Sequence, residues 1–254
     1  MQITLDEGYQ FGLGLFETVS VENKRPLFLG WHLERLHQSL DELGISRLVT
    51  EAEIMHFLSS QNADHFALKI MVSEKNCIFT TRPNPYTPEM LERGFRLVYS
   101  SVYRNETSPL VYHKTMNYGD CILEKRRAAS LGADEQIFLN SRGEICEGTA
   151  TNIFFAKEGR LYTPAVSCGL LPGILRRFLK ENFSVTECVL TRDEVAEMEE
   201  CFVTNSLMGV MPVTSLEEKL FSGGPWTEEC MAAYRKARNG GEAGEGVRFI
   251  KAFG

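Results

Sequence analysis

The sequence predicts a two-domain α/β (α+β) protein, and three observations lead to this prediction. The chain has 254 residues, which is room for one large or two medium domains. Apolar residues make up 43% and charged residues 24%, the balance of a folded globular protein. Strand-like and helix-like patterns occur on both sides of a polar, proline-ended segment. We therefore expect a small N-terminal α+β domain over 1–103, a linker over 104–111 and a larger C-terminal domain over 112–254.

The N-terminal half predicts a strand meander with two helices. A run rich in β-branched and aromatic residues follows the Gly12/Gly14 turn and predicts a strand over Leu13–Val21. Leucines at 3-4-3 spacing predict an amphipathic helix over Trp31–Leu43 that ends at Gly44. The remaining expected elements are a helix over Glu51–Leu58 and strands over Phe66–Val72, Cys77–Thr81 and Phe95–Tyr103.

The C-terminal half predicts short strands and three helices. The helices are expected over Asp120–Leu131, over Ile174–Asn182 after Pro172-Gly173, and over Thr227–Arg238 before Gly240-Gly241. A tight turn is expected at 140–143, where Asn and Gly suit the turn geometry. The strands are expected over Gln136–Asn140, Asn152–Ala156, Arg160–Thr163, Glu200–Thr204 and Val210–Val213.

Charge and composition exclude several classes of function. The net charge of −7 argues against a nucleic-acid partner or a membrane-surface partner, because both favour a basic face. The seven cysteines form no C-x-x-C pair, and the five histidines form no metal-ligand pattern, so we expect no metal site. The N-terminus lacks a basic region followed by an apolar one, and no apolar run approaches 18 residues. These features predict a cytoplasmic protein.

The motifs that carry chemistry are concentrated between His113 and Ile174. They are His113-Lys114-Thr115-Met116-Asn117-Tyr118, Gly132-Ala133-Asp134-Glu135, Glu147-Gly148-Thr149-Ala150-Thr151-Asn152 and Gly169-Leu170-Leu171-Pro172-Gly173-Ile174. Their order and spacing resemble the class IV aminotransferase family, the fold type IV enzymes that use pyridoxal 5'-phosphate. That family includes branched-chain aminotransferases, D-amino acid aminotransferases and 4-amino-4-deoxychorismate lyases. The resemblance implies a fold like that of D-amino acid aminotransferase, with the cofactor at the domain interface, and a homodimer.

The resemblance assigns Lys114 as the lysine that holds the cofactor covalently. A lysine amine attacks a carbonyl only when it is neutral, and an apolar pocket or a neighbouring cation favours that form. Glu147 matches the carboxylate that pairs with the pyridine nitrogen and keeps the ring protonated, so that the ring remains an electron sink.

The cofactor phosphate requires a cation and N–H donors. Arg35, in His32-Leu33-Glu34-Arg35-Leu36, matches the arginine of the family's phosphate motif, and a guanidinium fits a phosphate bidentately. The start of the predicted helix at Ile174 and Leu175 offers backbone N–H groups to an anion. Relatives often carry threonine at the second of these positions, so Leu175 contributes its N–H alone. Ser206 matches a hydroxyl residue that also reaches the phosphate.

Two further residues are assigned to the cofactor ring by resemblance, and each has a structural alternative. Leu171 matches the residue that packs on one face of the ring, although a core leucine would give the same sequence pattern. Tyr118 matches a tyrosine that binds the phenolic oxygen, although a packed tyrosine is equally consistent. The Gly12-Leu13-Gly14 run lacks the third glycine and the context of a nucleotide loop, so we interpret it as a turn near the active site.

The choice of reaction depends on Thr18 and on Asn205-Ser206-Leu207-Met208, which resemble the lyase branch more than the aminotransferases. Thr18 stands where the lyases use a hydroxyl near the reacting lysine, and Asn205 is expected to contact the substrate. Arg104 is a weaker substrate contact, with a solvated linker charge as its alternative. The reaction implied is cleavage of 4-amino-4-deoxychorismate, an amine, into 4-aminobenzoate and pyruvate for folate synthesis. The alternatives are a branched-chain or D-amino acid aminotransferase, and a non-catalytic protein of the same fold.

Overall fold

The computed structural model describes residues 2–240, and the Gly241 predicted to follow the last helix lies outside this range. The described chain divides into two compact units. The first unit holds 2–85 and His113–Gly119, and the second holds Tyr86–Tyr112 and 120–240. The α/β (α+β) fold class is confirmed. We find no helix within residues 2–240 with the length and apolar character that crossing a membrane requires.

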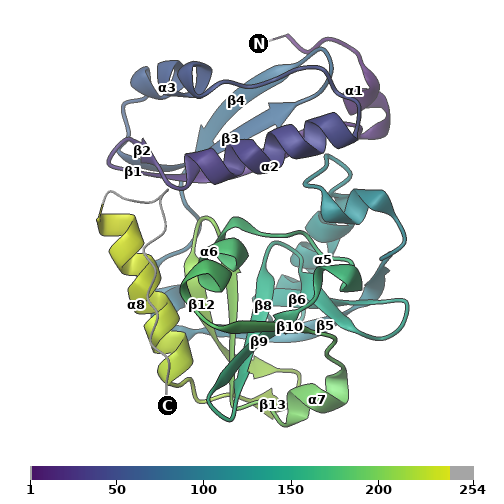
Figure 1. Cartoon of the computed structure of the whole chain (residues 1–254), viewed down its shortest axis with the longest axis vertical. Helices are drawn as coiled ribbons and strands as arrows, with labels where there is room; N and C mark the ends of the chain where they lie inside the picture. Colours follow the sequence, from purple (N-terminus) through teal and green to yellow (C-terminus); the bar gives the residue numbers. More distant parts are fainter. Residues whose placement is uncertain (1, 241–254) are drawn as a thin grey trace. The chain divides into compact units, whose positions relative to one another are not determined.

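The first unit is built on a four-stranded antiparallel sheet in the order β2-β1-β3-β4. Helix α2 runs along this sheet (Figure 1). Leucines of α2 and α3 pack on the inward residues of β1 and β3 to form one apolar core. The elements are α1 (Glu7–Phe11), β1 (Leu15–Glu22), β2 (Arg25–Pro26), α2 (Leu29–Glu42), α3 (Glu51–Ser59), β3 (His65–Val72) and β4 (Cys77–Arg82).

The second unit contains a nine-stranded mixed sheet, in the order β10-β9-β8-β11-β12-β5-β6-β7 with β13 paired to β12. Its strands are β5 (Phe95–Arg104), β6 (Glu135–Asn140), β7 (Ile145–Gly148), β8 (Asn152–Lys157), β9 (Arg160–Pro164), β10 (Val185–Cys188), β11 (Glu200–Asn205), β12 (Gly209–Leu216) and β13 (Lys219–Leu220). Its helices are α4 (Pro88–Arg93), η1 (Pro109–Tyr112), α5 (Gly119–Ser130), η2 (Val166–Cys168), α6 (Ile174–Asn182), α7 (Arg192–Ala196) and α8 (Pro225–Asn239).

The two units do not follow the boundaries expected from the sequence. β5 pairs in parallel with β12 and β6, so Phe95–Arg104 belongs to the second sheet rather than to an N-terminal domain. The expected linker over 104–111 begins in that strand and lies within the second unit. His113–Gly119 joins the first unit because it pairs with β1. A polar, proline-ended segment therefore marks a loop here and not the division between units.

Candidate active site

The segment that carries Lys114 is fixed along the start of β1. Lys114 O accepts a hydrogen bond from Phe16 N at 2.9 Å, and Met116 N donates to Gly14 O at 2.8 Å. His113 secures the same segment to α2, with its Nδ1 2.9 Å from the Ser39 hydroxyl. The backbone of Lys114 is thus held from two elements, and its position depends little on its own side chain.

The side chain of Lys114 lies against aromatic rings. Its Nζ is 4.4 Å from the ring centroid of Phe16 and 5.0 Å from that of Tyr118. The two rings meet edge to face, with their centroids 5.1 Å apart. Thr18 lies on the same face of β1 as Phe16, because side chains alternate along a strand. The first unit therefore brings three predicted residues, Thr18, Lys114 and Tyr118, to one region around Phe16.

Two glycines make this close approach of the Lys114 segment to β1 sterically feasible. Gly12 caps α1 in the left-handed region, at φ +73°, where residues with a side chain are strained. A Cβ on Gly14 would lie 2.8 Å from the Met116 sulfur and 2.9 Å from Val72 O. Gly12 forms the predicted turn at the end of α1, and Gly14 permits the close backbone contact with Met116 and Val72.

Arg35 is held by a carboxylate that the sequence analysis did not assign. Its Nε donates to Glu17 Oε1 at 2.8 Å and its Nη2 to Glu17 Oε2 at 2.7 Å, which is a bidentate pair. His32 Nδ1 lies 2.6 Å from Glu17 Oε2. Glu17 is 1% exposed and His32 is 1% exposed, so both groups depend on this network for polar partners.

The electrostatics of the network favour an ionised Glu17. Burial alone would raise the pKa of Glu17, but Arg35 and His32 outweigh it and lower the pKa to about 2. Burial lowers the pKa of His32 against the attraction of Glu17, so its neutral form is favoured. Its Nε2 is buried and has no hydrogen-bond partner within residues 2–240.

The sequence contains a pattern that indicates Glu17 as a buried carboxylate with partners. Leu15, Val19 and Val21 alternate on the buried face of β1, and Glu17 lies in the same row. A carboxylate on a buried strand face requires cationic or N–H partners. The His-x-x-Arg spacing of His32 and Arg35 places both side chains on one face of α2, which supplies those partners.

In the second unit, Glu147 is held by Arg104 and by the loop that carries Leu171. Arg104 Nη2 donates to Glu147 Oε1 at 2.7 Å, and Leu171 N donates to Glu147 Oε2 at 3.1 Å. The Arg104 guanidinium also lies over the Phe138 ring at 4.4 Å. The alternative interpretation of Arg104 as a solvated charge in a linker is wrong, because Arg104 ends β5 and forms a partly buried ion pair.

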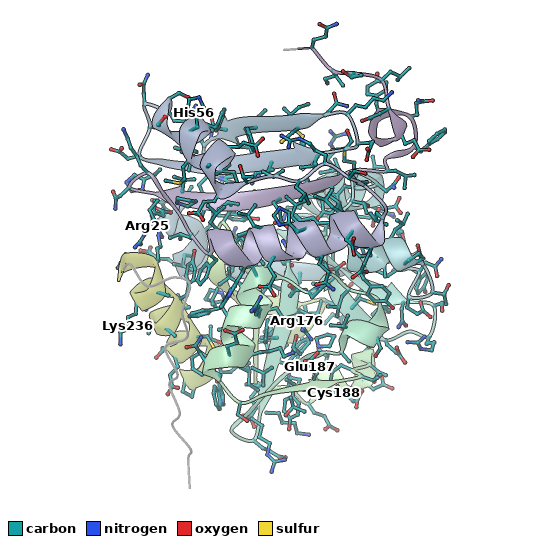
Figure 2. All side chains as sticks on the ribbon, turned by 45° about the horizontal axis from the view of Figure 1, so that its top comes forward. Arg25, His56, Arg176, Glu187, Cys188 and Lys236 are labelled. Carbon is teal, nitrogen blue, oxygen red and sulfur yellow. The ribbon has the colours of Figure 1, made fainter. Side chains whose placement is uncertain are left out.

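The loop before α6 is fixed at several points. Asn152 Nδ2 donates to Leu171 O at 2.8 Å, and a Cβ on Gly173 would lie 2.0 Å from Asn152 Oδ1. Within α6 itself, Arg176 points toward Glu187 on β10 (Figure 2), with its Nη2 2.5 Å from Glu187 Oε2, so the first turn of the helix is also held. No side chain caps the N-terminus of α6, so the first N–H groups at Ile174 and Leu175 can serve an anion.

Ser206 lies in the turn between β11 and β12, which Asn205 shapes. Asn205 Oδ1 accepts from Leu207 N at 2.9 Å and from Met208 N at 3.0 Å. Its Nδ2 donates to the Tyr86 hydroxyl at 2.9 Å. These contacts give Asn205 a structural role in the turn, in addition to the substrate contact predicted from the sequence.

The predicted residues are therefore distributed over the two units. Thr18, Arg35, Lys114 and Tyr118 lie in the first unit. The second unit contains the remaining residues, which are Arg104, Glu147, Leu171, Ile174, Leu175, Asn205 and Ser206. In the first unit Glu17 holds Arg35, and Phe16 borders Lys114 and Tyr118 on the other face of β1. In the second unit Glu147 holds Arg104 and the Leu171 backbone.

Comparison with known proteins identifies the family. The model of amino-transferase class IV matches residues 14–216, which include the elements from β1 to β12. The chain belongs to the class IV aminotransferase family. It is accordingly an enzyme by family, and the non-catalytic alternative is not supported.

Members of the class IV aminotransferase family with different activities resemble this chain about equally. An aminodeoxychorismate lyase of Bacillus subtilis is 28% identical over 91% of this chain and 87% of its own. A D-alanine aminotransferase of Bacillus licheniformis is 27% identical over 91% of this chain and 90% of its own. A solved structure from Legionella pneumophila, described as a candidate 4-amino-4-deoxychorismate lyase, matches with a TM-score of 0.87 and 28% identity, covering 93% of this chain and 96% of its own. Branched-chain aminotransferases are also among the similar proteins.

Proposed function

We propose that this class IV enzyme binds pyridoxal 5'-phosphate and cleaves 4-amino-4-deoxychorismate into 4-aminobenzoate and pyruvate. The observation that carries the proposal is the position of Lys114, whose Nζ lies 4.4 Å from the Phe16 ring beside Thr18 on β1. Thr18 matches the position at which the lyases use a hydroxyl near the reacting lysine, and it lies on the same face of β1 as Phe16. The similarity to the Bacillus subtilis aminodeoxychorismate lyase supports the same choice.

The residues present fit the cofactor. The N-terminus of α6 has no side-chain cap, so the N–H groups of Ile174 and Leu175 suit a phosphate. Arg35 would supply the guanidinium and Ser206 a hydroxyl to the same group. His32 donates its Nδ1–H to Glu17, so its buried Nε2, which has no partner within residues 2–240, is an acceptor that suits a donor group and not the phosphate itself.

The remaining contacts concern the pyridine ring. Glu147, with Arg104 as its counter-ion, would pair with the ring nitrogen. Leu171 would pack on one ring face, and Tyr118 would donate to the phenolic oxygen. When bound, the cofactor supplies an electron sink for the charge that develops at the carbon bearing the substrate amine.

Side chains of this protein would then transfer the proton of the amine-bearing carbon. Lys114 Nζ would first hold the cofactor and afterwards remove the proton from the amine-bearing carbon of the substrate. The aromatic rings of Phe16 and Tyr118 border that amine and limit the directions from which a substrate can reach it. The hydroxyl of Thr18 would orient the substrate beside Lys114, and Asn205 would contact a polar group of the substrate.

The cofactor assignment is tested by reduction with borohydride. The purified protein is expected to be yellow, and reduction should fix the cofactor to the peptide that contains Lys114. Lys114→Ala should abolish this adduct, whereas Lys75→Ala, an exposed lysine of the first unit, should leave it unchanged. A Lys114→Ala variant that still forms the reducible adduct would rule out the assignment.

The reaction is tested by supplying 4-amino-4-deoxychorismate without a keto-acid acceptor. We expect 4-aminobenzoate to form. The alternative is an aminotransferase, which the similarity to the Bacillus licheniformis D-alanine aminotransferase favours. Amino transfer from a D-amino acid or a branched-chain amino acid, with no 4-aminobenzoate, would establish the alternative instead.

We also propose a cytoplasmic homodimer that acts in folate synthesis, as the family resemblance implies. Sedimentation equilibrium tests the oligomer, because a dimer would have twice the chain mass of 28.7 kDa. A sedimenting mass equal to one chain would exclude it.

A further inference from the structure

Glu135 is a buried carboxylate, 0% exposed at the start of β6, and it lies outside the set of residues assigned to the cofactor. Its Oε1 accepts hydrogen bonds from Gln136 N at 3.0 Å and from Thr149 N at 3.2 Å, and the Thr149 hydroxyl donates to the same oxygen. Lys125 Nζ lies 3.3 Å from its Oε2. Apolar side chains are often as stable as a buried ion pair. Packing alone therefore does not explain a carboxylate at this position.

The contacts of Glu135 fix the turn that follows Glu147 in the chain. Thr149 belongs to this turn, which joins β7 to β8 and in which Gly148 N donates to Thr151 O at 2.7 Å. A Cβ on Gly148 would lie 3.0 Å from Glu135 Cγ, so the Glu135 side chain packs against the residue directly after Glu147. Glu135 thus holds the turn through a backbone N–H, through a hydroxyl and through direct contact.

The backbone at Glu147 needs such an anchor because the pairing of β7 with β6 is irregular there. Between the regular pairs at Ile145 and at Gly148, two residues of β7 face a single residue of β6, and Glu147 is one of the two. An extra residue of this kind bends the strand, redirects a side chain and interrupts the ladder of hydrogen bonds. The direction of the Glu147 side chain therefore depends on contacts outside the ladder.

The carboxylate of Glu147 is held separately, at both of its oxygens. Arg104 Nη2 donates to one oxygen and Leu171 N to the other. These contacts fix the carboxylate only if the backbone that carries it is fixed as well, and hydrogen bonds weaken steeply as their angles depart from linear. Glu147 thus has two kinds of anchor, one at its side chain and one at the turn that follows it.

We propose that Glu135 is a positioning residue, which holds this turn through Thr149 and thereby directs Glu147 toward the ring nitrogen of pyridoxal 5'-phosphate. The proposal rests on the assignment of Glu147 to that nitrogen under the proposed function, but it does not require the lyase reaction. It gives a role to the last residue of Gly132-Ala133-Asp134-Glu135, one of the motifs by which the sequence resembles the family.

Two cofactors that differ at one ring position test this role. In 1-deazapyridoxal 5'-phosphate a C–H group replaces the ring nitrogen, and the remaining contacts are available to both molecules. Equilibrium dialysis of the full chain, after removal of its cofactor, gives the dissociation constant of each. The ratio of the two constants measures the contact between Glu147 and the nitrogen. We expect the wild type to bind pyridoxal 5'-phosphate about tenfold or more tightly, since a hydrogen bond to a charged group contributes on this scale.

Variants at the contact between Glu135 and Thr149 should lower this ratio. Thr149→Val keeps the shape of the side chain and removes the hydroxyl donor, and it should reduce the preference for pyridoxal 5'-phosphate about fivefold. Glu135→Gln replaces a charged acceptor by a neutral one and should reduce the preference about threefold. Thr149→Ser retains the hydroxyl and should keep the preference of the wild type. Should Thr149→Val fail to fold, Glu135→Gln carries the test.

Thr227→Val is the matched control in the same unit. Glu200 is 5% exposed and accepts from Thr227 N at 2.8 Å and from the Thr227 hydroxyl at 2.7 Å. A threonine thus offers the same two donors to a buried carboxylate, but here the contact fixes the start of α8 and not the turn after Glu147. Thr227→Val should lower stability as Thr149→Val does and leave the ratio at its wild-type value.

Three results would overturn the proposal. The first is a wild type that binds the two cofactors equally. The second is a wild-type ratio in Thr149→Val, or in Glu135→Gln in its place, even where both affinities fall together, because Glu135 would then support the fold alone. The third is an equal loss of the ratio in Thr227→Val, because general destabilisation would then account for it. A wild type that binds neither cofactor would reject the proposed function and this inference with it, whereas failure to form 4-aminobenzoate would reject the lyase reaction alone.

Discussion

At the scale of single residues, two buried carboxylates organise the candidate site. Glu17 orients Arg35 in the first unit, and Glu147 is held by Arg104 in the second. A buried ion pair contributes modestly when intact, but removal of one partner leaves an uncompensated charge in a low-dielectric environment. The partners of these carboxylates should therefore be sensitive positions even where they contact no substrate.

Arg104→Gln tests this argument against a role in substrate binding. Glu147 is 5% exposed, so loss of the guanidinium should lower the free energy of unfolding by about 3 kcal/mol. Urea denaturation of the protein without added cofactor measures it. Arg177→Gln is the control, because Arg177 and its partner Glu181 are both 41% exposed, and it should change stability by less than about 0.5 kcal/mol. Equal stabilities for the two variants would favour the substrate contact.

The residue scale also shows where sequence prediction stops. Lys114, Arg35 and Glu147 were assigned because motifs of the family mark them. Glu17 and Lys69 lie outside those motifs, and their positions depend on which face of β1 and β3 each side chain occupies. That information requires strand register, which is set by pairing between segments about 50 residues apart.

At the scale of elements, long periodic segments were predicted well and short ones were missed. The helix over Ile174–Asn182 is confirmed with the same bounds, and the helix over Glu51–Leu58 is extended by one residue at Ser59. β7 and α7, with four and five residues, are too short to show a hydrophobic period. The boundary between the units was misplaced for another reason. β5 belongs to the second sheet because it pairs with β12 and β6, which are far from it in the sequence.

The loop before α6 gives a prediction at this scale. Gly173→Ala would place a Cβ 2.0 Å from Asn152 Oδ1 and displace the side chain that holds Leu171 O. We expect a loss of about 2 kcal/mol in stability and a roughly tenfold loss of affinity for pyridoxal 5'-phosphate, measured by fluorescence titration. Gly119→Ala, whose Cβ would meet no atom within 4 Å, should leave both unchanged. Normal cofactor affinity in Gly173→Ala would show that the loop geometry is not needed for binding.

At the scale of the whole molecule, the sign of the net charge differs from the sign of the charge at one local region. The chain has a net charge of −7, yet Arg35, Lys69 and Lys114 gather in the first unit. Their effect depends on burial, because exposed charges are screened by water and salt. Net charge therefore argues against a nucleic-acid partner but does not reveal that Lys69 and Lys114 lie over one aromatic ring, that of Phe16.

The same contrast between burial and exposure predicts how stability changes with pH. The pKa of Glu17 is about 2 in the folded protein against an ordinary value of 4.5, so its contribution is complete above pH 4.5 and is lost as the pH falls toward 2. Glu17→Gln should be about 3 kcal/mol less stable than the wild type at pH 7, and the difference should close near pH 2. Chemical denaturation at a series of pH values measures both curves.

Glu53 supplies the control for that experiment. Its pKa is also lowered to about 2, by the Thr50 backbone N–H and Arg47, but its side chain is 36% exposed at the start of α3, far more than that of Glu17. Screening should limit the cost of Glu53→Gln to about 1 kcal/mol or less at pH 7. A Glu17→Gln curve that runs parallel to the wild type from pH 7 to pH 2 would mean that Glu17 acts through packing, and its charge would then have no part in holding Arg35.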